Sequence, residues 1–188
     1  MKKGIEYKRK REGKTDYRKR LKILLGNKPR IVIRKSLKNI VMQIIEYSEN
    51  GDKVVVAASS KELEKKYGLK FNRGNIPCAY LTGYLLGKKA VKKNIKDAVL
   101  DSGFAAHIKG SKIYAGLKGA IDGGIKVKCS EDVFPKPEMI KGTHIANYAS
   151  KIKDKKEEYE KRFSGYIKKG IKPEDIPKYF DEVKNKIV

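Results

Sequence analysis

The side chains best suited to chemistry lie near the N-terminus, and they are basic and aromatic rather than nucleophilic. Residues 8–11 read Lys-Arg-Lys-Arg, with Tyr7 before them and Tyr17 a short way after. Basic side chains bind phosphate groups, and tyrosine rings stack on unpaired bases. Arg30 and Arg34 share one face of a predicted strand, where their planar guanidinium groups can reach phosphates or bases. This combination indicates nucleic-acid binding, although packing at a helix start explains Tyr17 equally well.

The aromatic content indicates which kind of nucleic acid to expect. The chain has eleven tyrosines and no tryptophan, and its aromatic residues form no regular ladder of the kind that binds single strands. Recognition of a folded RNA by its shape fits this pattern better than sliding along a single strand.

No set of nucleophilic or metal-binding residues has the spacing of a catalytic motif. Gly13-Lys14-Thr15 resembles the end of a phosphate-binding loop, but Lys8 stands where that loop needs a glycine. Zinc sites normally include two ligands two to four residues apart. The four soft ligands of this chain lack such a pair: Cys78, His107, Cys129 and His144.

Two other candidate groups also have structural explanations. Cys78 lies in an apolar helix start and is expected to be a small core residue. Asp97 and Asp101 bracket a short strand, where loop contacts account for them, although carboxylates at strand ends could also bind magnesium in a nuclease-like fold. Since no complete site can be assembled, the sequence predicts neither an enzyme nor a metal or cofactor.

The charge distribution supports the same reading. The 188 residues include 46 Lys and Arg against 22 Asp and Glu, a formal net charge of +24. Residues 1–35 hold 15 basic and 3 acidic side chains, so half of the excess lies in the first fifth of the chain. Such a chain repels itself unless a polyanion neutralises it, and the block at 8–11 is expected to stay unfolded until then.

A membrane partner is not expected. The longest apolar stretch, residues 76–87, is shorter than a spanning helix and contains Pro77. The basic N-terminus is not followed by an apolar run, so no secretory signal is predicted. We therefore expect a cytoplasmic protein with both thiols reduced.

The elements that must position these side chains begin with a short basic helix. Thr15 or Asp16 can cap it, Gly26 ends it, and its leucines form one stripe among the basic residues. Runs of β-branched residues then predict three antiparallel strands at 30–35, 39–47 and 53–59. Apolar residues on both faces of the second and third strands predict a sheet covered by helices on both sides.

The remaining elements complete an α/β fold. A helix is predicted from Ile76 to about Lys93, with Gly83 and Gly87 placed for close packing, followed by a short strand at 97–101. A second helix, capped by Ser111, stops at two glycines. The order βββαβα gives a mixed sheet with an antiparallel three-stranded start, joined by a parallel crossover and covered by helices.

The chain is expected to divide into three parts: a basic arm and short helix (1–27), an α/β globular domain (28–128), and a linker with a helical C-terminal extension (129–188). Residues 129–142 read as a surface connection. Residues with helical spacing follow, and a last helix starts at Pro173. Whether this extension docks on its own domain or on a neighbouring protein is open.

Several long blocks resemble a known family. They are GKTDYRKRLKILL (13–25), KPRIVIRKS (28–36), GDKVVVAASSKEL (51–63), GNIPCAYLTGYLLGKKA (74–90), AVLDSGF (98–104), GSKIYAGLKGAIDGG (110–124) and IKGTHIANYA (140–149). Together they resemble the large-subunit ribosomal protein L-eighteen family, and the C-terminal extension is similar to the archaeal form and to the eukaryotic counterpart L-five. The resemblance implies a 5S ribosomal RNA-binding protein of the central protuberance, without enzymatic activity.

The resemblance also implies which residues face RNA. From the arm, the helix, the first strand and the loop before the long helix, they are Lys8, Arg9, Lys10, Arg11, Lys14, Tyr17, Arg18, Arg20, Arg30, Arg34, Lys35, Ser36, Asn72, Arg73 and Asn75. In the turn after the first strand, Leu37 and Asn39 stand where the family pattern has Asn and His. In this turn, Lys35 and Lys38 are still expected to contact phosphate. The expected partners are 5S ribosomal RNA, large-subunit ribosomal RNA and neighbouring proteins, and the alternative is a general basic RNA-binding protein or RNA chaperone.

Overall fold

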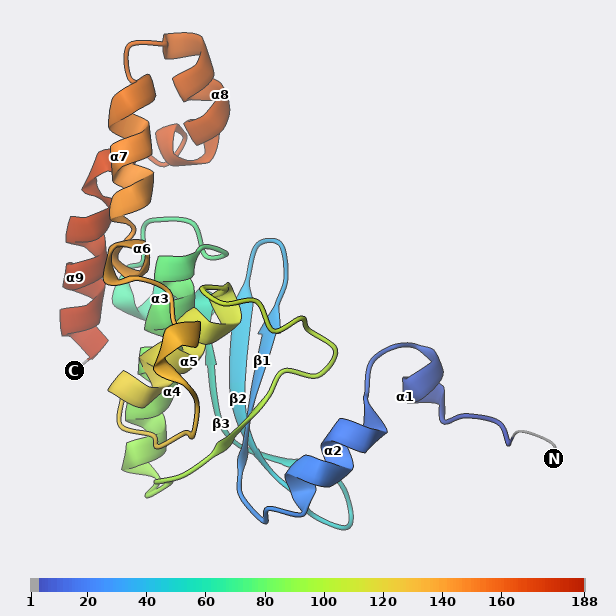
Figure 1. Cartoon of the computed structure of the whole chain (residues 1–188). Helices are drawn as coiled ribbons and strands as arrows, with labels where there is room; N and C mark the ends of the chain where they lie inside the picture. The colour runs from blue at the N-terminus through green and yellow to red at the C-terminus, as the bar shows by residue number, and fades with distance from the viewer. Residues whose placement is uncertain (1–3, 188) are drawn as a thin grey trace.

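A four-stranded mixed sheet lies at the centre of the fold, seen in a computed structural model that describes residues 4–187 (Figure 1). β1 (Arg30–Lys35), β2 (Ile40–Glu46) and β3 (Lys53–Ser59) form an antiparallel meander, and β4 (Val99–Asp101) pairs with β1 in parallel. The strand order is β3-β2-β1-β4. The predicted α/β class, the antiparallel start and all four strands are confirmed.

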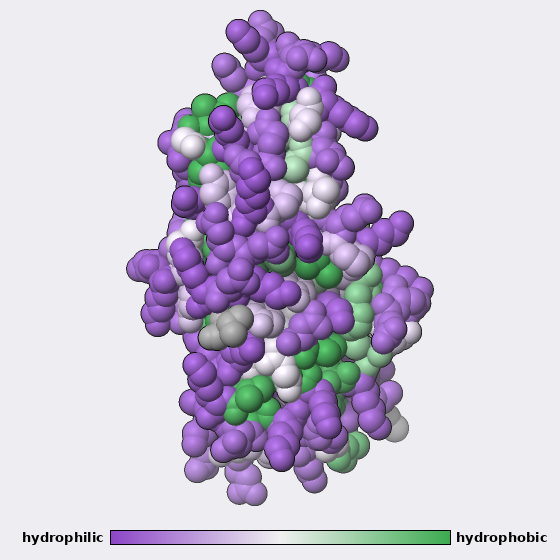
Figure 2. Space-filling model, turned by 90° about the vertical axis from the view of Figure 1, so that its left-hand side faces the viewer, coloured by the Kyte–Doolittle hydropathy of each residue, from purple (hydrophilic) through white to green (hydrophobic). Residues whose placement is uncertain are grey.

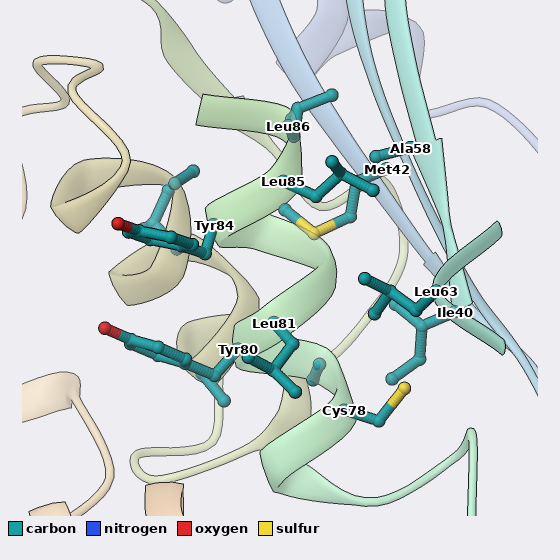
Figure 3. Close-up of a cluster of buried hydrophobic side chains, with 14 of the residues drawn as sticks. Ile40, Met42, Ala58, Leu63, Cys78, Tyr80, Leu81, Tyr84, Leu85 and Leu86 are labelled. Carbon is teal, nitrogen blue, oxygen red and sulfur yellow. The ribbon is translucent and has the colours of Figure 1, made fainter. Parts of the chain in front are cut away.

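One face of the sheet carries the main core. α4 (Ile76–Lys92) and α5 (Lys112–Asp122) pack on this face, and Figure 3 shows Leu85 and Leu86 of α4 on the side toward Met42 and Ala58 of the sheet. The strand residues buried on this face alternate along each strand as the pleat requires. They are Ile31, Ile33, Ile40, Met42, Ile44, Val56 and Ala58. Cys78 lies in the same core and is fully buried, as predicted.

α4 and α5 pack against each other unusually closely because glycines face the contact. A Cβ atom at Gly87 would lie 2.6 Å from the Ala120 carbonyl oxygen, and one at Gly83 would overlap the Gly116 carbonyl. Real Cβ atoms do not approach backbone that closely, so only glycine fits at these two positions. The predicted close packing of Gly83 and Gly87 is confirmed.

The opposite, outer face of the sheet is largely open, so the prediction of helices on both faces is wrong. Val32 and Gln43 on this face are half-buried, and Arg34 and Ala57 are exposed. The helix that approaches it is α2 (Tyr17–Leu24), which lies beside β4 and buries none of its own residues. Apolar character on both faces suggested two covers. Because Arg34 and Gln43 interrupt the outer face, however, it offers too little apolar surface for a packed helix.

One helix of the globular part was not predicted. α3 (Ser60–Tyr67) follows β3 directly. The Ser59 hydroxyl accepts a hydrogen bond from the Glu62 amide at its start, and Gly68 ends it in the left-handed conformation with φ of 70°. A serine followed three residues later by glutamate, and a closing glycine, are helix boundary signals present in the sequence.

The C-terminal extension is mostly helical and partly docked on the domain. The predicted surface connection contains two short elements, η1 (Glu131–Val133) and α6 (Pro137–Lys141). α7 (Thr143–Ile152) and α8 (Lys156–Ile167) follow and project beyond one end of the sheet, around a small cluster of Ala149, Ile152 and Phe163 (Figure 1). η2 (Pro173–Asp175) leads into the last helix, α9 (Ile176–Ile187).

α9 docks on the globular domain of the same chain. It packs on α4, and the rings of Phe180 and Tyr80 are 5.6 Å apart between centroids. Its apolar stripe, Ile176, Phe180, Val183 and Ile187, is buried in the main core. The side of the molecule that carries these helices is mostly hydrophilic, with separate hydrophobic patches, in Figure 2. The last part of the extension is therefore held by its own domain.

Candidate nucleic-acid interface

α2 is a basic helix held at its start by an acidic cap. Of the two predicted caps, Asp16 is the one used, since its Oδ1 accepts hydrogen bonds from the amides of Arg18 (3.0 Å) and Lys19 (3.1 Å). Arg18 and Lys19 are exposed. The predicted leucine stripe is present but has little cover, because Leu21 is 62% and Leu25 75% exposed. The orientation of α2 thus depends on polar contacts rather than on burial.

The arm before α2 contains one short helix, although charge repulsion predicted an unfolded block. α1 (Lys8–Arg11) is a single turn in which the amides of Lys10 and Arg11 both donate to the Tyr7 carbonyl. Glu6 pairs with Lys10, and Arg9 donates from Nε to the Thr15 hydroxyl at 2.9 Å. These local partners offset part of the repulsion among the four cations. All four side chains are exposed.

The aromatic pair of the arm is explained by an internal contact. The rings of Tyr7 and Tyr17 lie 5.1 Å apart between centroids, tilted by 42°. Tyr17 is half-buried at the start of α2, whereas Tyr7 is 72% exposed. The packing alternative for Tyr17 is the one the structure contains, and Tyr7 keeps an open ring face.

An open groove of about 570 Å³ runs between this segment and the outer face of the sheet. Its basic lining residues come from the arm, α2 and β1, which follow one another in the chain. They are Arg9, Lys14, Lys19, Arg20, Arg30 and Arg34. Three carboxylates, Asp16, Asp52 and Asp101, line the same groove, so positive charge is in excess. The structure thus brings five of the predicted RNA-facing residues together, and Lys19 joins them.

Arg30 is buried and forms ion pairs within the protein. It does share a strand face with Arg34, but its side chain is only 4% exposed. Its guanidinium lies 2.7 Å from an Asp52 oxygen and 2.9 Å from an Asp101 oxygen. Asp52 also pairs with Arg20 of α2 at 2.9 Å. Arg30 is therefore paired with carboxylates in this structure, and its expected contact with RNA stays a prediction.

Arg30 instead links three segments. Asp52 belongs to the β2–β3 turn, and Asp101 ends β4, where its Oδ1 also accepts the Gly103 amide at 3.0 Å. The network Arg20–Asp52–Arg30–Asp101 therefore ties α2 to the sheet. The loop contact predicted for Asp101 is confirmed. By contrast, Arg34 is exposed and forms no ion pair within residues 4–187.

The second group of predicted residues lies at the other end of β1. Ser36 closes the β1–β2 turn, since its hydroxyl accepts from the Asn39 amide at 2.9 Å and donates to the Asn39 carbonyl at 3.0 Å. Lys35 and Lys38 beside it are exposed. The loop before α4 packs against this turn, because a Cβ atom at Gly74 would lie 2.6 Å from the Leu37 carbonyl oxygen.

Within that loop, the two asparagines hold backbone. The Asn72 carboxamide oxygen accepts from the Gly74 amide, and that of Asn75 caps α4 by accepting from the Cys78 amide, both at 2.9 Å. Asn75 is half-buried in this role, and its expected contact with RNA stays a prediction. Arg73 is half-buried and pairs with Glu64 at 2.7 Å.

Sequence reasoning missed the loop that follows β4. Asp101, Ser102, Gly103 and Phe104 line the groove, and the Phe104 ring is 54% exposed beside it. Parallel pairing gives the reason, because Val32 of β1 lies opposite Asp101 of β4. The carboxyl ends of parallel strands meet at one edge of a sheet. The predicted crossover therefore already implied that residues 102–104 lie near Arg34.

Other reactive groups form no complete site. The Ser102 hydroxyl and the Tyr114 hydroxyl each lie 3.0 Å from a ring nitrogen of His107, so tyrosine stands where a catalytic triad needs a carboxylate. Burial raises the pKa of the Cys78 thiol to about 12, which leaves it protonated. In residues 4–187, no three His, Cys, Asp or Glu side chains gather as metal ligands, and no helix has the length and apolar character of a membrane span.

Comparison with known proteins shows which family this chain belongs to. Residues 2–98 match the family described as ribosomal large subunit proteins 60S L5, and 50S L18. The chain is also 49% identical over 184 residues to the large ribosomal subunit protein uL18 of the archaeon Methanococcus maripaludis, which covers 98% of this chain and 95% of that protein. The match extends through the C-terminal helices. The basic groove thus lies in a chain that belongs to the L5 and L18 family of ribosomal large-subunit proteins.

Proposed function

We propose that this protein binds 5S ribosomal RNA and helps to anchor it in the central protuberance of the large subunit. The observation that carries the proposal is the basic groove between the arm, α2 and the open face of the sheet. Membership in a family of large-subunit proteins supports it. Large-subunit ribosomal RNA and neighbouring ribosomal proteins are the further partners, on ribosomes in the cytoplasm.

Phosphate neutralisation supplies most of the affinity in this proposal. The cations available for this are those of the arm and α2 and Arg34 at the groove, with exposed Lys35 and Lys38 at the end of β1 and in the turn after it. Each phosphate they neutralise releases counterions, so binding weakens steeply with salt. Since Lys19 and Arg34 have no ion pair within residues 4–187, they need not break one to bind.

The choice of RNA comes from the rigid part of the interface. The Arg20–Asp52–Arg30–Asp101 network fixes α2 against the sheet, and therefore fixes the spacing between its cations and Arg34. Phe104 and Tyr7 offer exposed rings at the groove and on the arm, where unpaired bases can stack. Fixed spacing and a few stacking positions select an RNA by its shape.

A competition gel shift tests this function. Labelled 5S ribosomal RNA is bound at physiological salt and challenged with excess transfer RNA of similar size. We expect the 5S complex to persist, because transfer RNA supplies phosphates but not the matching shape. Equal displacement by transfer RNA would support the alternative, a general basic RNA-binding protein or chaperone.

A further inference from the structure

A second basic hollow, separate from the groove, lies between the loop before α4 and the C-terminal extension. It measures about 380 Å³ and opens to solvent. Lys38 of the β1–β2 turn and Lys70 and Arg73 of the loop line one side, and Tyr166 of α8 and Lys169, two residues beyond α8, line the other. Two regions more than ninety residues apart in the chain thus contribute to one site.

Positive charge in this hollow exceeds the negative charge available to it. Glu64 of α3 pairs with both Arg73 (2.7 Å) and Lys169 (3.1 Å). Lys38 forms no ion pair in residues 4–187, and Lys70 lies over the ring of Tyr179 at 5.0 Å. Glu64 therefore pairs with two of the four cations, and Lys38 and Lys70 have no carboxylate partner within residues 4–187. Like charges held this close favour an anionic ligand.

The cations are held in place by packing. Gly74 packs tightly against the Leu37 carbonyl, which keeps the turn that carries Lys38 beside the loop that carries Arg73. Tyr166 is half-buried, with its hydroxyl beside the Asn72 backbone and the Asn75 side chain, so α8 is fixed to the same loop. Gly165, also in the lining, leaves open space where a side chain would project.

We infer that this hollow binds a phosphate of the RNA backbone, which makes the end of α8 an RNA-contacting part of the C-terminal extension. The inference rests on the proposed function and extends its site. An RNA strand that passes Arg34 on the outer face reaches Lys38 in the turn after β1, and Lys38 lines the hollow. An acidic segment of a neighbouring protein is the competing ligand, and the experiment below separates the two.

The decisive variant is Lys169→Gln, with Lys168→Gln as its matched control. Both residues are exposed, both changes remove one charge, and Lys168 does not line the hollow. Affinity for 5S ribosomal RNA is measured over a range of salt concentrations. Losing one phosphate contact is expected to reduce the slope of log affinity against log salt by about 0.7 to 0.9. We expect that reduction, with a roughly five- to tenfold weaker complex, for Lys169→Gln alone.

A tethered cleavage probe identifies the ligand directly. Cys129 is exposed and Cys78 buried, so a hydroxyl-radical source can be attached to Lys169→Cys in a Cys129→Ser background. Cleavage of bound 5S ribosomal RNA near the probe supports the inference. An uncut RNA would overturn it, as would equal salt slopes for the two glutamine variants, and either result would favour a protein ligand.

The two proposals fail in different ways. If the wild-type protein selects 5S RNA over transfer RNA while Lys169→Gln behaves like Lys168→Gln, only the role of α8 is refuted. If the wild-type protein shows no selection, the proposed function fails, and the inference that rests on it fails too.

Discussion

α2 and α9 are both amphipathic helices rich in lysine, yet only one of them is packed into the protein. α9 buries Ile176, Phe180, Val183 and Ile187, whereas α2 buries no residue. Leu21 of α2 and Leu25, which caps its C-terminal end, are mostly exposed. The difference lies in the surface that each helix faces. α9 meets the apolar side of α4, and α2 meets the polar outer face of the sheet. An apolar stripe therefore docks only where a second apolar surface awaits it.

The largest expected effect in this comparison is on stability, from Phe180→Ala. Phe180 is 2% exposed, and replacing a buried phenylalanine by alanine typically costs about 3–5 kcal/mol of the free energy of unfolding. Urea unfolding measures the loss. Leu25→Ala on α2 is the control, and because Leu25 is 75% exposed its effect should stay within about 0.5 kcal/mol. Similar losses from both variants would contradict the comparison.

Deleting residues 1–14 should have the opposite effect to Phe180→Ala, because it should weaken RNA binding and leave stability nearly unchanged. The deletion removes seven basic and two acidic side chains, and none of residues 4–14 is buried. We expect the affinity for 5S ribosomal RNA to fall at least about a hundredfold at physiological salt, with a shallower salt dependence. The melting temperature should hardly change. An unchanged salt slope would show that the arm does not contact phosphates.

The fold could be predicted from the sequence wherever periodicity and boundary signals agreed. The strands, α4, α5 and the cap at Asp16 all follow from such local patterns. The open outer face could be recognised only in part, because its β-branched residues match those of a buried strand, whereas Arg34 and Gln43 interrupt it. α3 was recognisable from Ser59, Glu62 and Gly68 but was missed.

The site was less predictable because residue type does not reveal a side chain's partner. Arg30 and Arg34 have the same strand face and chemistry, but Asp52 and Asp101, which bind Arg30, come from distant turns. Lys169 could not be connected with Lys38 from spacing alone, because no periodic pattern relates α8 to the β1–β2 turn. The partners of Arg30 and the proximity of Lys169 to Lys38 are visible only from the tertiary contacts.

Arg30→Ala and Arg34→Ala separate the structural and the binding role of one strand face. Removing Arg30 leaves Asp52 and Asp101 without their buried partner, and we expect a loss of about 2 kcal/mol of stability, reduced by the partial exposure of both carboxylates. Arg34→Ala should leave stability nearly unchanged and weaken RNA binding by about 1–3 kcal/mol. Thermal unfolding beside RNA titration checks both. If Arg34→Ala destabilised the fold as much as Arg30→Ala, the distinction would be wrong.

Glu64→Gln should give the smallest effect, and it tests a part of the extension held by charge rather than by burial. Glu64 joins α3 to Arg73 of the loop and to Lys169 beyond α8. Partial burial alone would raise the pKa of Glu64, but the Lys169 hydrogen bond and the charge of Arg73 outweigh it and lower the pKa from its ordinary value of 4.5. Surface pairs of this kind contribute less than about 1 kcal/mol.

The lowered pKa of Glu64 also fixes the pH dependence of this contribution. A carboxylate with a lowered pKa in the folded protein stabilises it above pH 4.5, and this contribution is lost as the pH falls through the folded-state pKa. Glu64→Gln should therefore be slightly less stable than wild type at pH 7, and the two should converge well below pH 4.5. Urea unfolding at pH 7 and well below pH 4.5 measures the stability difference between Glu64→Gln and wild type. Glu160→Gln on α8 is the control, because it breaks no ion pair within residues 4–187. If the stability difference between Glu64→Gln and wild type persisted well below pH 4.5, Glu64 would act through packing rather than charge. The α8 region would then be held by burial, as α9 is, and not by polar contacts, as the arm is.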